Sequence, residues 1–397
     1  MPQIVTINEN VVRGAAPSLL QQKGVLVSLG GTNTATGTLS FLSEAADLTA
    51  LLPPAQTTAA SGNAEASSTA QAGSPAATPS SATQELQAMV ASWFANSSSG
   101  VWVLELGGTK AIADGLGSFI ASNPLTFYSY VLPRGSQKMD DRLPAFLGNQ
   151  GGNNARIYFF LCGGKDDAVS LTASPSKAVF YGAEAAGASQ TGEHLAAAVC
   201  AQFLSARPGP VNRLAPMNFR FLTGITAWAE AGNGPAFASM KASNISFPGT
   251  SREGGVDGTI LFWGNFINGD PMSEWYGADW AAINLELQLA NLLIEDSQPG
   301  IRPLVYDQNG IDRITARAEQ TLGGGEAAGC VTGYSITATP FAQYVTQNPA
   351  SYTAGDYSGI AATITTPRGF ISLIFNLAVD FSGQSVAATT DTTSTGV

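Results

Sequence analysis

The chain has 397 residues, of which 44% are hydrophobic and 12% are charged, and its 29 acidic and 18 basic residues give a net charge of −11. This length allows two domains with large cores, and the acidic balance argues against nucleic acid or an anionic membrane as a partner. No segment comes near the roughly 18 consecutive apolar residues of a membrane span, and no secretory signal is visible. We therefore expect a soluble protein without membrane insertion. So few charges favour a surface covered by other protein, with a large Ser/Thr-rich monomer as the alternative.

The first 22 residues contain one short β-prone run, Gln3, Ile4, Val5, Thr6 and Ile7, and no pattern that would anchor them to a core. We expect residues 1–22 to form an extended arm, with an ordinary frayed terminus as the alternative. Lys23 to Leu29 predicts the first strand. Residues 55–82 are almost wholly Ala, Ser, Thr, Gly, Gln and Pro, so they cannot bury enough apolar area to offset their conformational entropy. We expect an exposed, low-complexity loop there.

A regular alternation of helices and strands follows this loop. A capping box from Ser81 to Gln84 begins an amphipathic helix with Leu86, Met89, Val90, Trp93 and Phe94 on its apolar face. The next strands are expected at 101–106, 126–132, 156–162 and 178–181, and the next helices at 111–121, 142–147 and 192–204. Such alternation predicts an α/β domain with a largely parallel sheet.

The C-terminal part reads as α+β, with short strands at 244–247, 259–263, 333–339 and 361–366. Between them, Asp279 stands just ahead of a helix that is apolar nearly all round up to Ile294, which predicts a buried helix. A second, polar helix from Ile311 to Leu322 carries Asp312, Arg313, Arg317 and Glu319. We expect this helix to stop at the three glycines 323–325.

The clearest strand pattern of the chain comes last. Apolar residues alternate with more polar ones at Ile371, Leu373, Phe375, Leu377, Val379 and Phe381. A strand with one strongly apolar face must find a covered sheet, either in a neighbouring subunit or within its own chain. The Thr/Ser-rich residues 383–397 are expected to be a disordered tail.

Residues suited to catalysis or metal binding are sparse. His194 is the only histidine, and its place at the start of a helix predicts a solvated surface residue. Gly107 to Lys110 could bind an anion and Gly163 to Asp167 a cation, but a plain turn and a solvated loop are simpler interpretations. We therefore predict no catalytic residue, no cofactor and no metal.

Three segments together resemble one protein family. The run from Gly255 to Asp279, the turn from Tyr306 to Arg313 and the segment from Phe221 to Thr226 are similar to segments of contractile tail sheath proteins of bacteriophages and R-type pyocins. The resemblance implies a two-domain sheath subunit with extended arms. Its expected parts are an N-terminal arm (1–22), an outer α/β domain (23–222), a tube-proximal core domain (223–382) with a C-terminal strand arm (370–382), and the tail.

The same resemblance implies a non-enzymatic, homo-oligomeric function. Many copies would form a helical cylinder around an inner tail tube protein, meet baseplate and tail terminator proteins, and contract to drive the tube through the host envelope. The arms would link neighbouring subunits. The mixed charge of helix 311–322, in a charge-poor protein and beside a buried helix, predicts that its charged residues face the tube, with a plain solvent face as the alternative. Such a protein belongs to the virion tail and is made in the cytoplasm of a bacterial host. A doubly wound α/β enzyme and another virion protein, such as a tube, baseplate or capsid protein, remain as alternatives.

Overall fold

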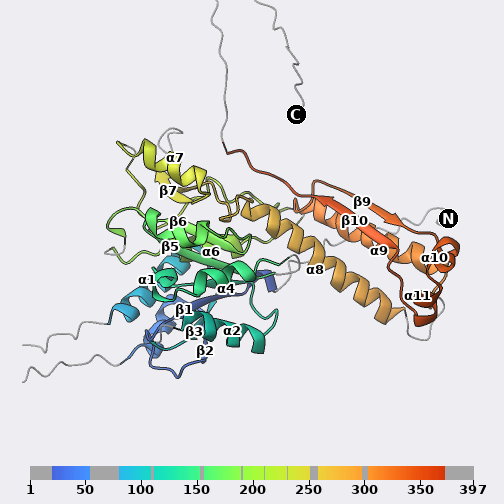
Figure 1. Cartoon of the computed structure of the whole chain (residues 1–397), viewed down its shortest axis with the longest axis horizontal. Coiled ribbons are helices and arrows are strands. Elements are labelled where there is room, and N and C mark those ends of the chain that lie inside the picture. The colour runs from blue at the N-terminus through green and yellow to red at the C-terminus, as the bar shows by residue number, and fades with distance from the viewer. Residues whose placement is uncertain are drawn as a thin grey trace, which may run out of the picture.

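The computed structural model describes residues 20–53, 80–108, 111–152, 156–188, 191–209, 211–229, 231–250, 258–296 and 303–371. Two lobes are joined by one long helix, α8 (Met272–Glu295) (Figure 1). We call residues 20–271 the sheet lobe, and the C-terminal half of α8 with residues 303–365 the distal lobe. No helix within the described ranges is long and apolar enough to cross a membrane.

A six-stranded sheet in the order β2-β3-β1-β4-β5-β6 forms the centre of the sheet lobe. All neighbours run parallel except β2 and β3, which confirms the prediction of an α/β fold with a largely parallel sheet. Every residue of β1, β4, β5 and β6 is buried, as is usual for parallel strands covered on both faces. The strands are β1 (Gly24–Ser28), β2 (Leu39–Leu42), β3 (Val101–Glu105), β4 (Ser129–Val131), β5 (Tyr158–Gly163) and β6 (Val179–Ala183).

Helices cover both faces of this sheet. Alternate side chains of β1 point in opposite directions, so Leu26 lies in one core while Val25 and Val27 lie in the other. Helices α1 (Ser81–Asn96) and α6 (Leu195–Leu204) pack on the Leu26 side, and α2 (Ile112–Ser122) and α4 (Leu143–Asn149) pack on the opposite side. The shorter elements are η1 (Leu20–Gln22), η2 (Ala45–Leu51), α3 (Ser136–Met139), η3 (Lys165–Ala168) and α5 (Val169–Thr172).

The start of α1 corrects two predicted boundaries. Ser80 is the N-cap, because its hydroxyl accepts a hydrogen bond of 3.1 Å from the backbone N–H of Thr83. The cap therefore lies one residue before the predicted box. Residues 81 and 82 are helical and do not belong to the low-complexity loop that we expected at 55–82.

An antiparallel pair, β7 (Phe247–Thr250) and β8 (Thr259–Phe262), extends the sheet lobe beside helix α7 (Gly234–Ala242). β7 begins at the residue where the predicted strand 244–247 was expected to end, and α7 was not predicted. Leu222 and Ile225 share one core, although the expected domain boundary runs between residues 222 and 223. That boundary stays a prediction.

Helix α8 differs from its prediction at both ends. It begins seven residues before Asp279, so this aspartate does not stand ahead of the helix but lies buried within it. Tyr276 and Trp280 are fully buried, whereas Leu287 is 52% and Ile294 is 64% exposed. The expectation of a helix buried along its whole length is therefore wrong for the C-terminal half in a single chain.

Helix α9 (Gln308–Ala327) is longer than predicted, because it continues through the three glycines instead of ending there. At its start, Asp307 caps the helix by accepting a hydrogen bond of 2.8 Å from Gly310 N. The absence of a side chain at Gly325 has a packing reason. A Cβ atom there would lie 2.9 Å from the ring of Trp280, so the glycine allows α9 to approach α8 closely.

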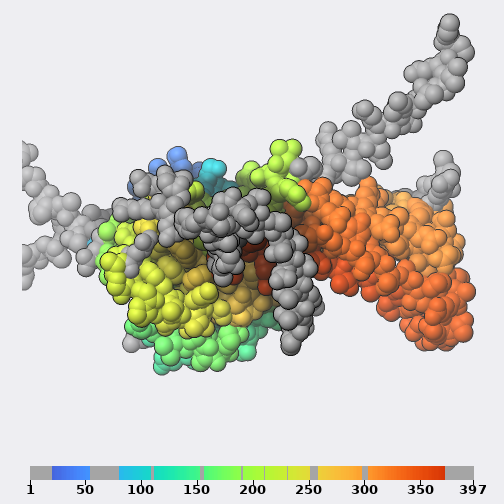
Figure 2. Space-filling view, turned by 90° about the horizontal axis from the view of Figure 1, so that it is seen from above, coloured from blue at the N-terminus to red at the C-terminus, as the bar shows by residue number. Residues whose placement is uncertain are grey.

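The distal lobe is completed by a two-stranded antiparallel ribbon, β9 (Gly333–Ala338) and β10 (Ile360–Thr365), and by the helices α10 (Phe341–Gln347) and α11 (Pro349–Ala354). These two helices were not predicted. Figure 2 shows this lobe, in orange and red, projecting from the rest of the molecule.

Several expected features lie outside the described residues. They are the N-terminal run Gln3–Ile7, most of the low-complexity loop, the C-terminal strand from Leu373 to Phe381, and the tail. Ile371 is the last described residue, where it lies half-buried in a bend.

Candidate functional site

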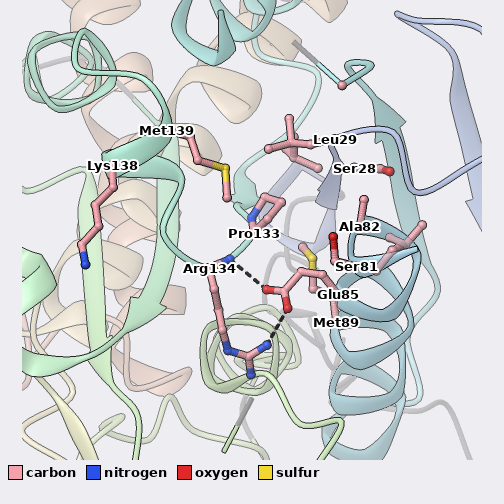
Figure 3. A pocket seen from close by; sticks show the side chains of 13 residues that line it. Ser28, Leu29, Ser81, Ala82, Glu85, Met89, Pro133, Arg134, Lys138 and Met139 are labelled. Atoms are coloured by element: carbon pink, nitrogen blue, oxygen red, sulfur yellow. Dashed lines mark hydrogen bonds and ion pairs between the residues drawn. The ribbon is translucent and has the colours of Figure 1, made fainter. Parts of the chain in front are cut away.

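A pocket of about 590 Å³ opens at the carboxyl ends of β1 and β4 (Figure 3). In open α/β sheets this is the usual place for a ligand, so the pocket is where the enzyme alternative can be examined. Its lining comes from the end of β1, the first turns of α1 and the segment after β4. The residues labelled in Figure 3 are Ser28, Leu29, Ser81, Ala82, Glu85, Met89, Pro133, Arg134, Lys138 and Met139.

Arg134 is one of the residues that line this pocket, and its side chain is fully engaged. It donates to Glu85 Oε2 at 2.6 Å, to both carboxylate oxygens of Glu184 at 2.5 and 2.8 Å, and to the backbone oxygen of Glu193. Burial opposes the positive charge, but the hydrogen bond to Glu184 and the nearby carboxylates raise the pKa of Arg134 above its ordinary value. The guanidinium therefore serves to hold α1, β6 and α6 together rather than to receive an anionic ligand.

His194 completes this network and corrects a prediction. It is fully buried as the N-cap of α6, where Nδ1 accepts a hydrogen bond of 3.1 Å from Ala197 N and Nε2 lies 3.3 Å from Glu85 Oε1. The prediction that His194 is a solvated surface residue is therefore wrong, because α1 covers it. Although burial alone would raise the pKa of Glu85, the hydrogen bond from His194 and the charge of Arg134 lower it to about 2.

A cysteine and this histidine lie close enough to suggest a nucleophile and its base. Cys162 Sγ is 3.7 Å from both ring nitrogens of His194. Both residues are completely buried, however, and burial raises the pKa of the Cys162 thiol well above its ordinary value. A catalytic cysteine needs an accessible thiolate, so this pair is part of the core.

The two loops that could bind ions are occupied by groups of the chain itself. The carboxylate of Glu105 accepts the backbone N–H groups of Gly30, Thr32 and Gly107, which would otherwise be available to an anion. Lysines pair with both aspartates of the second loop, Lys165 with Asp166 and Lys138 with Asp167. Among the described residues, no group of three or more His, Cys, Asp or Glu side chains could hold a metal ion.

Sequence reasoning missed the network around Arg134. The available signal was the position of charged residues just after strands: Arg134 follows β4, and Glu184 follows β6 directly. The carboxyl ends of parallel strands lie at one edge of a sheet, so Arg134 and Glu184 could have been expected at the same edge.

The four charged residues of α9 that were predicted to face the tube fall into two pairs. Arg313 forms an ion pair with Asp296 at the end of α8, and Arg317 donates to Gln288 Oε1 at 3.3 Å. Both arginines therefore hold α9 against α8. Asp312 and Glu319 are exposed, and these two acidic side chains can meet another molecule.

The C-terminal half of α8 carries an exposed apolar stripe. Leu287, Ala290 and Ile294 are exposed and are spaced by three and four residues, so they share one helix face, which the half-buried Ile283 continues. Next to it, a pocket of about 380 Å³ is lined mainly by apolar side chains, including Leu289, Leu304 and Tyr306. Exposed apolar surface of this kind is typical of contacts between proteins.

The ribbon of β9 and β10 offers a further surface. Within the described ranges, no third strand pairs with either of its two outer edges. A two-stranded ribbon is only marginally stable by itself and gains from an added strand. Every residue of β10 is exposed or half-buried.

Comparison with known proteins gives the fold a name. No protein-family model and no curated protein sequence matches the chain. The helical sheath of the anti-feeding prophage in its contracted state matches with a TM-score of 0.61 at 11% identity, over 96% of this chain and 99% of that one. A chain of the same prophage's contracted baseplate matches with a TM-score of 0.55 at 14% identity, over 95% and 98%.

A sheath tail protein from Listeria innocua is also similar, with a TM-score of 0.50 at 8% identity, over 81% of this chain and 90% of that one. The two prophage chains match 96% and 95% of this chain, so their likeness includes both lobes and α8 and not the parallel sheet alone. Over nearly its whole length, the chain therefore has the fold of contractile tail sheath proteins.

Proposed function

We propose that the protein is the subunit of a contractile tail sheath. Many copies polymerise into a helical cylinder around an inner tube, and the cylinder contracts to drive the tube through the host envelope. The observation that carries this proposal is the match to a helical sheath along 96% of the chain, which includes the distal lobe. An isolated parallel sheet would be compatible with many functions, whereas this pair of lobes on one helix is a much narrower likeness.

The surfaces of the distal lobe support a function in assembly. An apolar stripe, an apolar pocket and an open ribbon edge all lie on this part of the chain. Each of them would be covered in a polymer. The enzyme alternative has weaker support, because the pocket at the sheet edge is spanned by internal ion pairs.

The arms are the second part of the proposal. Residues Gln3–Ile7 and Ile371–Phe381 would be donated as strands to neighbouring copies. They would add to the edges of the β9–β10 ribbon, to which no further strand pairs in the part of the chain that the structure describes. Strand addition gives main-chain hydrogen bonds, and alternate side chains give specificity. The alternative is that the C-terminal strand pairs within its own chain.

The position of the subunit in the tail is the third part of the proposal. The 223–382 domain would face the inner tube protein through the exposed Asp312 and Glu319 on α9, and the 23–222 domain would lie outside. Baseplate and tail terminator proteins would meet the two ends of the cylinder. The assembled protein would belong to a virion or phage-like tail, after synthesis in the bacterial cytoplasm.

The decisive experiment is microscopy of the purified protein, alone and with its tube protein. Negative-stain images should show hollow cylinders with a helical repeat. Protein that stays monomeric at high concentration, even with the tube protein present, would contradict the proposal.

The tube-facing helix can be tested separately. Changing Asp312 and Glu319 to Lys reverses the charge of the two exposed carboxylates without touching the ion pair of Arg313 with Asp296. We expect cylinders that form normally but bind the tube less tightly. Full tube occupancy in the double variant would exclude this face as the tube contact.

A further inference from the structure

Residues 366–371 form a strap that returns from the distal lobe to the sheet lobe (Figure 1). β10 ends at Thr365, whose backbone oxygen still accepts a hydrogen bond of 2.7 Å from Thr332 N in the distal lobe. Three residues later, Arg368 reaches the first turn of α8. The last described residues therefore lie beside the sheet lobe, away from the tip formed by α10 and α11.

An ion pair holds the strap to α8. Arg368 Nε and Nη2 donate to the two carboxylate oxygens of Glu274 at 2.5 and 3.3 Å. This two-pronged arrangement of a planar guanidinium and a carboxylate fixes direction as well as distance. The Arg368 side chain is 68% exposed and that of Glu274 only 21%, so the strap lies over a carboxylate set in the surface of the lobe.

Two contacts follow directly along the strap. Asn218 Nδ2 donates to the backbone oxygen of Phe370 at 2.8 Å, while Asn218 Oδ1 accepts from Trp263 N at 3.0 Å. Trp263 has a positive φ of 73°, so the loop that orients Asn218 is itself held in a constrained conformation. A Cβ atom on Gly369 would lie 2.6 Å from Pro216, so only glycine allows so close a passage.

Three consecutive residues are therefore each fixed by a different contact, while the Phe370 side chain points outward and is 82% exposed. We propose that the contacts of Arg368, Gly369 and Phe370 with Glu274, Pro216 and Asn218 form a clamp. This clamp sets where the segment after Ile371 leaves the subunit, and so directs that segment to a second copy of the chain. The inference rests on the proposed sheath function for its partner, but the clamp is a property of the single chain.

The clamp can be tested on the unassembled protein by trypsin. Glu274→Gln removes the partner of Arg368 but keeps the cleavage site after Arg368. We expect cleavage of the 368–369 bond, followed by mass spectrometry, to become faster by about threefold or more, in line with the loss of one exposed but bidentate ion pair. The matched control is Glu286→Gln. Glu286 also lies on α8, and this change breaks its ion pair with Arg156 but should leave the rate of cleavage after Arg368 unchanged. Equal cleavage in Glu274→Gln and wild type would overturn the clamp.

The effect on assembly is tested by charge reversal. Glu274→Arg and Arg368→Glu should each reduce the fraction of protein in sedimenting cylinders, and the double exchange should restore it, because the pair is then re-formed with opposite orientation. Thermal melting of each variant confirms that the fold is intact. Two outcomes would contradict the proposal that the clamp directs the segment after Ile371 to a second copy. They are single variants that assemble like wild type, and a double exchange that does not restore the sedimenting fraction. If the wild-type protein forms no cylinders, the sheath function is refuted, and so is the proposal that the clamp directs the segment to a second copy. The trypsin assay tests the clamp independently of assembly.

Discussion

Glu85 makes the stability of the folded protein depend on acid pH. Its pKa of about 2 in the folded protein lies below the ordinary 4.5, so the carboxylate contributes stability above pH 4.5 and loses it as the pH falls towards 2. The contribution is at most about 3 kcal/mol, since one pKa unit corresponds to about 1.4 kcal/mol. The free energy of unfolding can be measured with denaturant for wild type and Glu85→Gln. The difference between the two should become smaller as the pH falls from 4.5 towards 2. A constant difference down to pH 2 would contradict the assignment.

The effect of Asp279 on the pH dependence of stability is opposite to that of Glu85. Its Oδ2 accepts the hydroxyls of Tyr128 at 2.8 Å and Tyr158 at 2.7 Å, and burial raises its pKa despite these hydrogen bonds. Ionising it in the folded protein therefore costs free energy, so wild type should lose stability as the pH rises above about 4, which is near the value for a free aspartate. Asp279→Asn should lack this loss. Asp279→Leu should cost about 2–5 kcal/mol at any pH, because two buried hydroxyls lose their acceptor.

At the scale of elements, the contact between α8 and α9 depends on one of three adjacent glycines. Gly325→Ala should destabilise the protein by about 1–3 kcal/mol, because the new methyl group would meet the ring of Trp280. Gly324→Ala is the matched control. No atom lies within 4 Å of a Cβ there, so the better helix former should add about 0.5–1 kcal/mol. Thermal or urea unfolding distinguishes the two, and equal effects would show that the packing argument fails.

The elements that could be predicted are those whose pattern reflects their own burial. The strands β1 and β5 are continuous apolar runs, and α1 carries an apolar stripe, so local sequence was enough. Asp279 was placed just ahead of the helix, and not inside it, because its hydrogen-bond partners stand 121 and 151 positions away in the sequence. His194 was misread as solvated because the helix that buries it lies about a hundred residues earlier. The three glycines were misread as a helix stop because the reason for one of them, the close approach of Gly325 to Trp280, lies on another helix. Long-range packing decided each of these cases.

At the scale of the whole molecule, the low-complexity insertion should be dispensable. Its two ends are already close, since Asn33 N donates to Leu51 O at 2.8 Å and the Thr83 hydroxyl donates to Gly31 O at 3.2 Å. Replacing residues 56–78 with a short Gly/Ser linker should change stability by only about 1 kcal/mol, because closure entropy varies slowly with loop length. Melting temperature and cylinder formation should match wild type. A folded variant that no longer assembles would show that the insertion takes part in contacts.

Helix α8 has a mechanical consequence for any assembly of this chain. Its 24 residues span about 36 Å, and Tyr276 belongs to the core of the sheet lobe while Trp280, one turn later, belongs to the core with α9. No joint lies between the two cores, because the helix crosses from one to the other with Asp279 tied to the sheet in between. The chain therefore behaves as a lever: a tilt of about 10° at one end moves the other by about 6 Å over this length. In the proposed cylinder, a change of length would therefore come from tilting and sliding whole copies past one another, and the strain of that movement would fall on the connections between them.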